Sequence, residues 1–167
     1  MGNGVDHASI MLIGEAPGAD EDQQGTVFIG KAGQLLDKIL AACNFSRQKQ
    51  LFITNIVRCR LPGNRAPEEE EIAACIPFLE RQINLIDPAI LVTLGATALR
   101  SLAGKGSRIT RDRGKWQYYG NRLLMPTYHP AALLRNPGLK RETWEDFKEV
   151  IRKYRELIDP DHPCNYL

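Results

Sequence analysis

The 167-residue sequence has no apolar run that approaches the roughly 20 residues needed to span a membrane. Its first nine residues, MGNGVDHAS, hold neither a basic segment nor a long apolar segment, so we expect no secretory signal and a cytoplasmic protein without membrane attachment. The four cysteines show no CxxC spacing, which favours buried or idle thiols in a reducing compartment. The nucleotide-binding motifs GxGxxG and GxxxxGK[ST], internal repeats and linkers are also missing from the sequence.

Charge is nearly balanced overall, and a formal net charge of +2 indicates no particular partner. The cationic residues are nevertheless concentrated in residues 100–141, where Asp112 is the one acid. This basic segment includes Arg113 and Lys115. A segment of one charge sign could follow a phosphate backbone, or it could be a solvated face of a globular protein. Charge alone leaves both interpretations open.

Two alternating hydrophobic patterns predict an α/β fold. Continuous apolar runs, typical of strands covered on both faces, occupy residues 9–14, 51–57, 89–95 and 122–128. Helical spacing of apolar residues occupies residues 31–43, 67–86, 96–103 and 141–158, and Pro77 is expected to divide the second of these helices. We therefore expect one domain over residues 1–167, a three-layer α/β/α sandwich with a mainly parallel central sheet.

Local signals refine this expectation. Pro67 predicts a helix start, and the acids Glu68–Glu71 suit a first helical turn, where the macrodipole favours negative charge, so they need no catalytic role. Pro126 marks the last strand as an edge or a strand end. Residues 107–119 are expected to be irregular or hairpin-like. The proline-rich tail from Asp159 is expected to be loose.

Polar or glycine-rich features follow three of the predicted strands. They are the GEAPG turn at residues 14–18, Asn55 late in the second strand, and His129 just past the last strand. Because the carboxyl ends of parallel strands meet at one edge of a sheet, we expect these features to form one pocket. The pocket by itself names no reaction, since Asn55 could also be a turn residue bonded to its own backbone, and His129 a satisfied core histidine.

Four segments, in order, carry a resemblance to a known family: GEAPG followed by acids, VFIGKAGQLLDKIL, TNIVRCRLPGNRAP and YHPAALLRNP. Together they resemble the family 4 uracil-DNA glycosylases of the uracil-DNA glycosylase superfamily, over about residues 6–151. The resemblance implies a monomeric, monofunctional DNA-repair hydrolase that flips uracil out of single- or double-stranded DNA, releases the base and leaves an abasic site. A degenerate, non-catalytic member that binds uracil-DNA or a nucleotide is the alternative.

The resemblance assigns three residues to the flipped base. Phe28 would stack on uracil, and the amide of Asn55, with both a donor and an acceptor, would read its O4 and N3–H edge. His129 would donate to uracil O2, where negative charge builds as the glycosidic bond breaks.

The same resemblance assigns the turn after the first strand to the sugar and the water. Ala16 would bring a backbone N–H group close to the nucleotide. Glu15 is expected to position the water or to support the turn, and Glu21 is a second candidate for the base that activates the water. A solvated loop acid is the alternative for Glu21.

Residues that would contact DNA follow His129. Leu133, Leu134 and Arg135 would lie on a loop that presses into DNA, where the apolar residues fill the gap left by the base. Without the resemblance they are one exposed turn of helix. Arg113 and Lys115 are further candidates, as phosphate contacts in the basic segment.

Family 4 members ligate a [4Fe–4S] cluster with four cysteines, and here Cys59 and Cys75 match two of them. The other two would precede the first strand, and this sequence has no cysteine there. Two thiolates cannot hold a cluster that needs four. We therefore expect the cluster to be absent or incomplete in this chain, although a truncated start, or substitution by Cys164 and another group, are alternatives.

Overall fold

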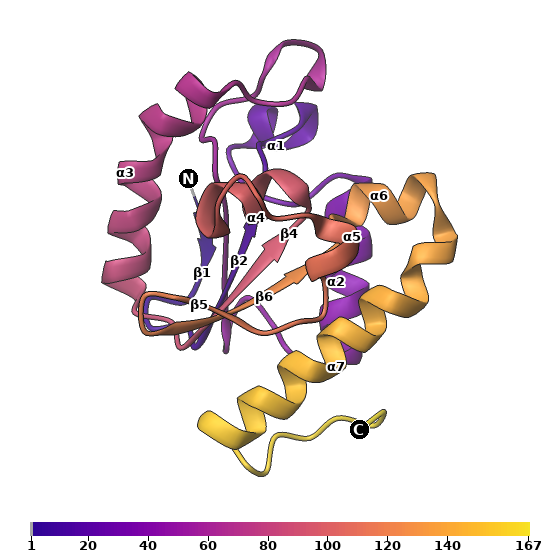
Figure 1. The fold of residues 1–167 in the computed structure, drawn as a ribbon. Coiled ribbons are helices and arrows are strands. Elements are labelled where there is room, and N and C mark those ends of the chain that lie inside the picture. The colour runs from indigo at the N-terminus through magenta and orange to yellow at the C-terminus, as the bar shows by residue number, and fades with distance from the viewer. Residues whose placement is uncertain (1) are drawn as a thin grey trace.

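A six-stranded mixed sheet forms the centre of the computed structural model, which describes residues 2–167 (Figure 1). The strand order is β1-β3-β2-β4-β6-β5; β2, β3, β4 and β6 are parallel, and β1 and β5 are antiparallel edge strands. The strands are β1 Gly2–Gly4, β2 Ile10–Gly14, β3 Leu51–Asn55, β4 Ile90–Leu94, β5 Gln117–Tyr119 and β6 Arg122–Thr127. The expectation of a mainly parallel sheet is confirmed.

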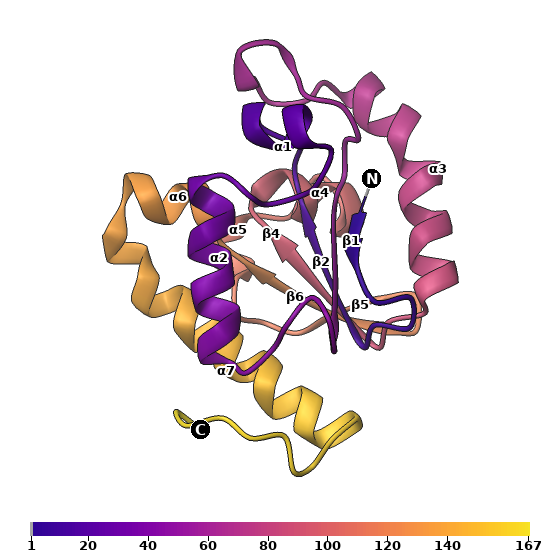
Figure 2. The ribbon, with the colours of Figure 1, turned by 180° about the vertical axis from the view of Figure 1, so that it is seen from behind.

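Helices cover both faces of the sheet, which confirms the three-layer arrangement (Figures 1 and 2). The α-helices are α1 Ala19–Gln24, α2 Lys31–Ala42, α3 Glu69–Ile86, α4 Ala96–Ala103, α5 Ile109–Asp112, α6 Pro130–Arg135 and α7 Lys140–Leu157. Two short 3-10 turns are η1 Pro62–Asn64 and η2 Pro137–Leu139. Among the described residues, no helix is long and apolar enough to cross a membrane.

Successive side chains of a strand point to opposite faces of the sheet, so the interior is divided into two hydrophobic cores. In β2, Ile10 and Leu12 face α2 and α7, whereas Met11 and Ile13 face α3 and α4. The first core is completed by Leu36 and Leu40 of α2 and by Phe147, Val150, Ile151 and Tyr154 of α7. The second is completed by Leu79, Ile83 and Ile86 of α3 and by Ala98 and Leu99 of α4. Every residue of β2 is buried, which explains its unbroken apolar run.

The expectation that Pro77 divides a helix is wrong, since α3 runs continuously through it. Proline has no N–H group, so the carbonyl of Ala73, four residues before Pro77, lacks its usual helical hydrogen bond. Ala73 and Pro77 both lie on the exposed face of α3, where water can bond to that carbonyl. The opposite face of α3 is anchored in the second core. The helix also begins at Glu69 rather than at Pro67, with Glu68 as its N-cap and acids in its first turn as expected.

Two elements had no hydrophobic signal in the sequence. Strand β1 pairs antiparallel with β3 through its backbone, with Asn3 opposite Ile53. Its Gly4 lies so close to β3 that a Cβ there would be 2.1 Å from the carbonyl oxygen of Leu51. Helix α1 follows the GEAPG turn and carries acids in its first turn. The segment expected to be irregular or hairpin-like contains α5 and β5.

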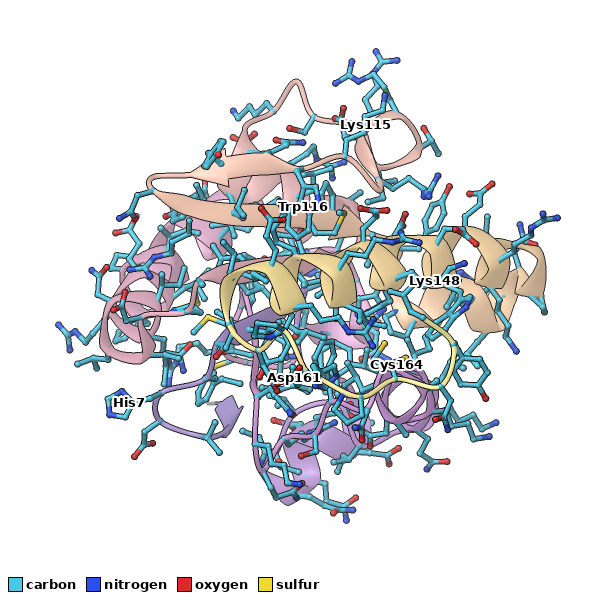
Figure 3. The ribbon with its side chains drawn as sticks, turned by 90° about the horizontal axis from the view of Figure 1, so that it is seen from below. His7, Lys115, Trp116, Lys148, Asp161 and Cys164 are labelled. Carbon is cyan, nitrogen blue, oxygen red and sulfur yellow. The ribbon has the colours of Figure 1, made fainter. Side chains whose placement is uncertain are left out.

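The C-terminal tail is not loose, which corrects the expectation from its composition. His162 is buried, its Nε2 donates to the carbonyl of Cys43 at 2.9 Å, and its ring stacks on Phe45 at a centroid distance of 4.8 Å. Figure 3 shows the tail crossing below the sheet, with Cys164 beside α2, where its thiol contacts the carbonyl of Ala42 at 3.4 Å. Contacts with residues far away in sequence therefore order the tail.

The carboxyl ends of β2, β3, β4 and β6 lie together at one edge of the sheet, the upper edge in Figure 1. Helices α1 and α6 begin beyond this edge. The segments that follow these four strands therefore meet at one place, which is where open α/β sheets bind ligands.

The tail contacts predict a large loss of stability when His162 is replaced. We expect His162→Ala to lower the free energy of unfolding by about 2–3 kcal/mol, because it removes a buried ring and leaves the Cys43 carbonyl without its donor. Asp161→Ala, at an exposed position of the same tail, should change it by less than about 0.5 kcal/mol. Guanidinium denaturation measures both, and equal small changes would show that the tail contributes nothing to folding.

Candidate active site

The register of β2 and β3 brings the turn and the asparagine together. Gly14, the last residue of β2, pairs with Asn55, the last residue of β3. A Cβ at Gly14 would lie 2.6 Å from the Asn55 Oδ1 atom and 2.6 Å from Cζ of Phe28. Only glycine leaves room here for the aromatic ring and the amide to approach the same point of the backbone.

A cavity of about 250 Å³ opens at this point. It is lined by Ala16, Gly18, Glu21, Phe28, Ala32, Gly33, Asn55, Asn64, His129 and Ala131. Pockets for drug-sized ligands usually measure roughly 300–1,000 Å³, so this one suits a single small heterocycle. A larger hollow of about 610 Å³ adjoins it and shares Ala16, Asn64, His129 and Ala131 with it. The structure thus brings all three predicted base-binding residues into one cavity.

Asn55 presents an unpaired acceptor. The residue is 6% exposed, and its Oδ1 atom is buried without a hydrogen-bond partner among residues 2–167. An unpaired buried acceptor destabilises a fold by about 1–3 kcal/mol, so such atoms occur mostly where a ligand supplies the missing donor. The alternative of a turn residue bonded to its own backbone therefore fails for Oδ1.

His129 is held as a neutral donor. It is the N-cap of α6, and its Nδ1 atom accepts the backbone N–H of Ala131 at 3.0 Å. Burial, reinforced by the charge of Arg135 and opposed by that of Glu21, lowers the pKa of His129 from the ordinary 6.5 to about 4. A neutral ring that accepts at Nδ1 carries its proton on Nε2, so the ring offers an N–H donor.

Phe28 adopts an unusual backbone conformation. Its φ angle is +52°, which is rare for a bulky residue, and the residue is only 6% exposed. The ring lies 5.4 Å from that of His129, at an angle of 32° between the planes. A Cβ at Gly33 would come within 2.0 Å of the Phe28 carbonyl, so the first turn of α2 lies directly against this backbone.

Glu21 bonds to the backbone of its own loop. Its carboxylate accepts N–H groups from Gly18 at 3.0 Å, Ile29 at 2.8 Å and Gly30 at 2.6 Å. Burial opposes ionisation, but these backbone hydrogen bonds outweigh it and lower the pKa of Glu21. A carboxylate stabilised in this way is a poor proton acceptor, although it lines the cavity.

Glu15 faces the larger hollow. Its Oε2 atom accepts the hydroxyl of Thr97, at the start of α4, at 2.5 Å. Its Oε1 atom accepts no hydrogen bond from any residue in the described part of the chain and so remains available to a water. Ala16 borders both cavities, between Glu15 and the base-sized pocket.

The three residues predicted for the DNA-facing loop differ in exposure. Leu133 is fully buried, because it lies on the inner face of α6, and it is therefore unsuited to pressing into DNA. Leu134, at 46% exposure, and Arg135 point outward, and Arg135 borders the larger hollow.

Arg113 and Lys115, both predicted as phosphate contacts, differ in whether their charge is available to a ligand. The Arg113 guanidinium forms a bidentate ion pair with the buried Asp146 of α7, and Thr127 donates to the same carboxylate at 2.7 Å. Arg113 is therefore occupied inside the structure, joining its loop to α7 behind the end of β6. Lys115 is exposed and projects from the edge of the molecule beside Trp116 (Figure 3).

The cysteines do not supply a cluster site. Cys59 is exposed and Cys75 is half-buried on α3, whereas Cys43 lies buried at the end of α2, beside Cys164. Burial and the neighbouring Cys164 raise the pKa of the Cys43 thiol, which disfavours the thiolate that iron requires. Within residues 2–167, no three His, Cys, Asp or Glu side chains are grouped to hold a metal. The donor set of this chain does not fit a four-thiolate cluster.

Three residues near the site were not singled out from the sequence. Thr97 contacts Glu15, Asn64 borders both cavities, and Arg47 donates to the backbone of Phe28. Asn64 stands in the LPGNRAP segment that carried the resemblance, which is a usable signal. Thr97 and Arg47 have no such signal, because their roles arise from contacts distant in sequence.

Fold and site together define an α/β protein with a base-sized polar cavity at the carboxyl ends of parallel strands. The family model of the uracil DNA glycosylase superfamily matches residues 1–148. The type-4 uracil-DNA glycosylase of Sulfurisphaera tokodaii is 46% identical over 157 residues, 89% of this chain and 71% of the relative. That of Thermotoga maritima is 42% identical over 154 residues, 90% of this chain and 80% of the relative.

A DNA polymerase of Bacillus phage SP01 is also similar, with 32% identity over 166 residues that cover 99% of this chain and 17% of the polymerase. These matches extend over the segments that build the cavity. The chain belongs to the uracil-DNA glycosylase superfamily, within its type-4 group.

The environment of His129 predicts its titration. We expect its ring resonances in NMR to shift with a midpoint near pH 4 rather than 6.5, because burial disfavours the charged ring. In the unfolded chain this ring binds its proton near pH 6.5, whereas in the folded chain it does so only near pH 4. The stability contributed by neutral His129 is therefore complete above about pH 6.5 and is lost as the pH falls towards 4. His7 and His162, replaced singly, identify the His129 signals. A midpoint near 6.5 would contradict a neutral donor at this position.

Proposed function

We propose that this protein excises uracil from DNA by hydrolysing its N-glycosidic bond, as a monofunctional glycosylase acting on a flipped nucleotide. The observation that carries the proposal is the unpaired Oδ1 atom of Asn55, buried in a base-sized cavity that also contains Phe28 and His129. A base that enters this cavity leaves the DNA stack, and the unpairing energy is lowest for mispaired or single-stranded uracil.

Base recognition rests on Asn55 and Phe28. The unpaired Oδ1 accepts the N3–H of uracil, and the amide N–H group of the same side chain donates to O4. Cytosine presents the opposite donor and acceptor pattern on this edge and would leave the buried amide mismatched. The Phe28 ring supplies a flat apolar surface against which the base stacks.

Stabilisation of the leaving base rests on His129. As the glycosidic bond breaks, the uracil ring acquires negative charge, part of it on O2. The Nε2–H of neutral His129 donates to this oxygen, and a preorganised donor of this kind contributes about 3–4 kcal/mol in other enzymes. Because Nδ1 is bonded to Ala131, the donating tautomer is already selected before substrate binds.

Hydrolysis also requires a positioned water. Glu15 is the stronger candidate to hold it, because it lines the larger hollow and Thr97 bonds to only one of its carboxylate oxygens, Oε2. Glu21 supports the loop that carries Phe28 instead, since both of its oxygens accept backbone N–H groups. Ala16 borders both cavities, and its backbone N–H would contact the nucleotide.

DNA contact falls to exposed residues around the cavity. Leu134 and Arg135 are exposed, so Leu134 would fill the gap that the flipped base leaves and Arg135 would contact a neighbouring phosphate. Lys115 is a more distant phosphate contact. Arg113 supports the fold through Asp146 and takes no direct part.

The direct test of function uses oligonucleotides with uracil or thymine at one position, followed by alkali to cleave abasic sites. We expect cleavage at uracil alone, and Asn55→Asp should lower kcat/KM by about a hundredfold or more, since a carboxylate removes the donor to O4 and places an unpaired charge in the cavity. Asn121→Asp, at an exposed surface position, is the matched control and should retain full activity.

The outcomes of this assay also decide between catalysis and binding. Folded protein that fails to cleave at uracil would refute the glycosylase. Retention of uracil-containing DNA through a denaturing gel, without release of the base, would favour the non-catalytic binding protein instead.

The two acids are separated by a second prediction. Glu15→Gln should lower the single-turnover rate by about a hundredfold, within the range typical of a general base, and leave thermal unfolding nearly unchanged. Glu21→Gln should instead lower the free energy of unfolding by about 1–2 kcal/mol, since an amide replaces the charged acceptor of several backbone N–H groups. Quenched single-turnover kinetics and denaturation measure both effects. The reverse pattern would move the water-positioning role to Glu21.

A further inference from the structure

Arg47 lies outside the cavity but contacts the backbone that carries Phe28. It follows α2 in the chain, and its side chain is only 14% exposed. Its Nη1 atom donates to the carbonyl of Val27 at 2.6 Å, and its Nη2 atom donates to the carbonyl of Phe28 at 2.7 Å. Asp37 of α2 accepts from Nε at 3.3 Å and from Nη2 at 3.2 Å, which orients the guanidinium.

The peptide unit between Phe28 and Ile29 is therefore held from both ends. Its C=O accepts from the Arg47 guanidinium, and its N–H donates to the Glu21 carboxylate at 2.8 Å. The C=O and N–H of a trans peptide point in opposite directions, so a cation and an anion lie at the two ends of one dipole. Rotation of this peptide would break both charged hydrogen bonds at once.

This peptide determines where the aromatic ring lies. Phe28 has a φ of +52°, a conformation that costs about 1 kcal/mol or more for a residue with a Cβ and needs support from its surroundings. The backbone of α2 lies against the Phe28 carbonyl at Gly33 and blocks movement in that direction. The guanidinium and the carboxylate then fix the remaining freedom, which is rotation of the peptide plane.

We propose that Arg47, oriented by Asp37, is a positioning residue that holds Phe28 as the stacking surface for the flipped base. This inference rests on the proposed function for the role of the ring, but the position of the ring can be measured without substrate. Arginine suits the task because its planar fork reaches two carbonyls and a carboxylate together, which the single ammonium of lysine cannot reproduce.

The first test is spectroscopic and needs no DNA. The Phe28 ring lies 5.4 Å from the His129 ring, so its ring current shifts the His129 ring protons in NMR. We expect Arg47→Met and Phe28→Ala each to move the His129 resonances and to leave those of His162 in place. Arg152→Met removes a surface ion pair with Glu149 and should move neither. Unchanged His129 resonances in Arg47→Met would overturn the proposal, whether or not the protein excises uracil.

The second test measures excision from a single-stranded uracil oligonucleotide. Stacking of a base on an aromatic ring is worth about 5- to 150-fold in affinity, so Arg47→Met should lower kcat/KM within that range, mainly through KM. In a Phe28→Ala background the same substitution should have almost no effect, because the group on which Arg47 acts is gone. An equal loss in both backgrounds would overturn the proposal.

Conservative variants keep the test usable if Arg47→Met fails to fold. Arg47→Lys retains the charge and one hydrogen bond and should recover part of kcat/KM. Asp37→Asn releases the guanidinium without removing it and should displace the His129 resonances less than Arg47→Met does. If both variants behave as the unmodified protein does, Arg47 has no positioning role. If no protein in the series excises uracil while the His129 resonances still move, the proposed function fails and the positioning of Phe28 stands.

Discussion

At the carboxyl end of β2, Gly14 lies in register with Asn55, and its missing side chain leaves the space that the Phe28 ring and the Asn55 amide approach. Any other residue would bring a Cβ within 2.6 Å of both groups. Those atoms cannot retreat easily, because the Phe28 backbone lies against α2 and Asn55 is held in register with Gly14 by the pairing of β3 with β2. The parallel register of two strands thus sets the size of the cavity and the distance between the groups that would face a base.

Several charged groups near this cavity act on the backbone rather than on a ligand. Glu21 accepts N–H groups of the loop between α1 and α2, and Arg47 donates to carbonyls of the same loop. Behind β6, Arg113 neutralises the buried Asp146. Burial raises the pKa of this carboxyl, and the hydrogen bonds from Arg113 and Thr127 offset only part of that increase. Charge in this protein therefore holds loops at fixed positions, which preorganises a site whose own residues are mostly neutral.

Neutral groups suit this chemistry. An imidazole with a depressed pKa keeps its Nε2–H as a donor throughout the neutral range, and an amide would read a base edge without adding charge to a buried cavity. The unpaired acceptor of Asn55 reduces the stability of the free protein, and a ligand that donates to it would satisfy it. The arrangement resembles other recognition sites in which a buried polar group left unpaired rejects the wrong ligand.

Local pattern accounts for much of the architecture. Runs such as residues 10–13 and the helical spacing of residues 31–43 predicted the strands, the helices and the mainly parallel sheet, because burial on both faces leaves a distinct hydrophobic pattern. The convergence of strand ends then predicted that Asn55 and His129 would meet. Pro77 and the tail were misjudged from composition, since burial of the opposite face of α3 and the contacts of His162 come from distant residues.

The sequence by itself therefore determined the order of elements, the edge of the sheet where the site lies, and the segments that resemble a known family. Only the tertiary structure decided which side chains line the cavity there and which contact the surrounding backbone instead. Leu133 is buried while Leu134 is exposed, Arg113 is paired internally, and Arg47 reaches a loop 19 residues away. The physical reason is that hydrophobic periodicity is a local property, whereas the hydrogen bonds that orient a site join residues that only folding brings together.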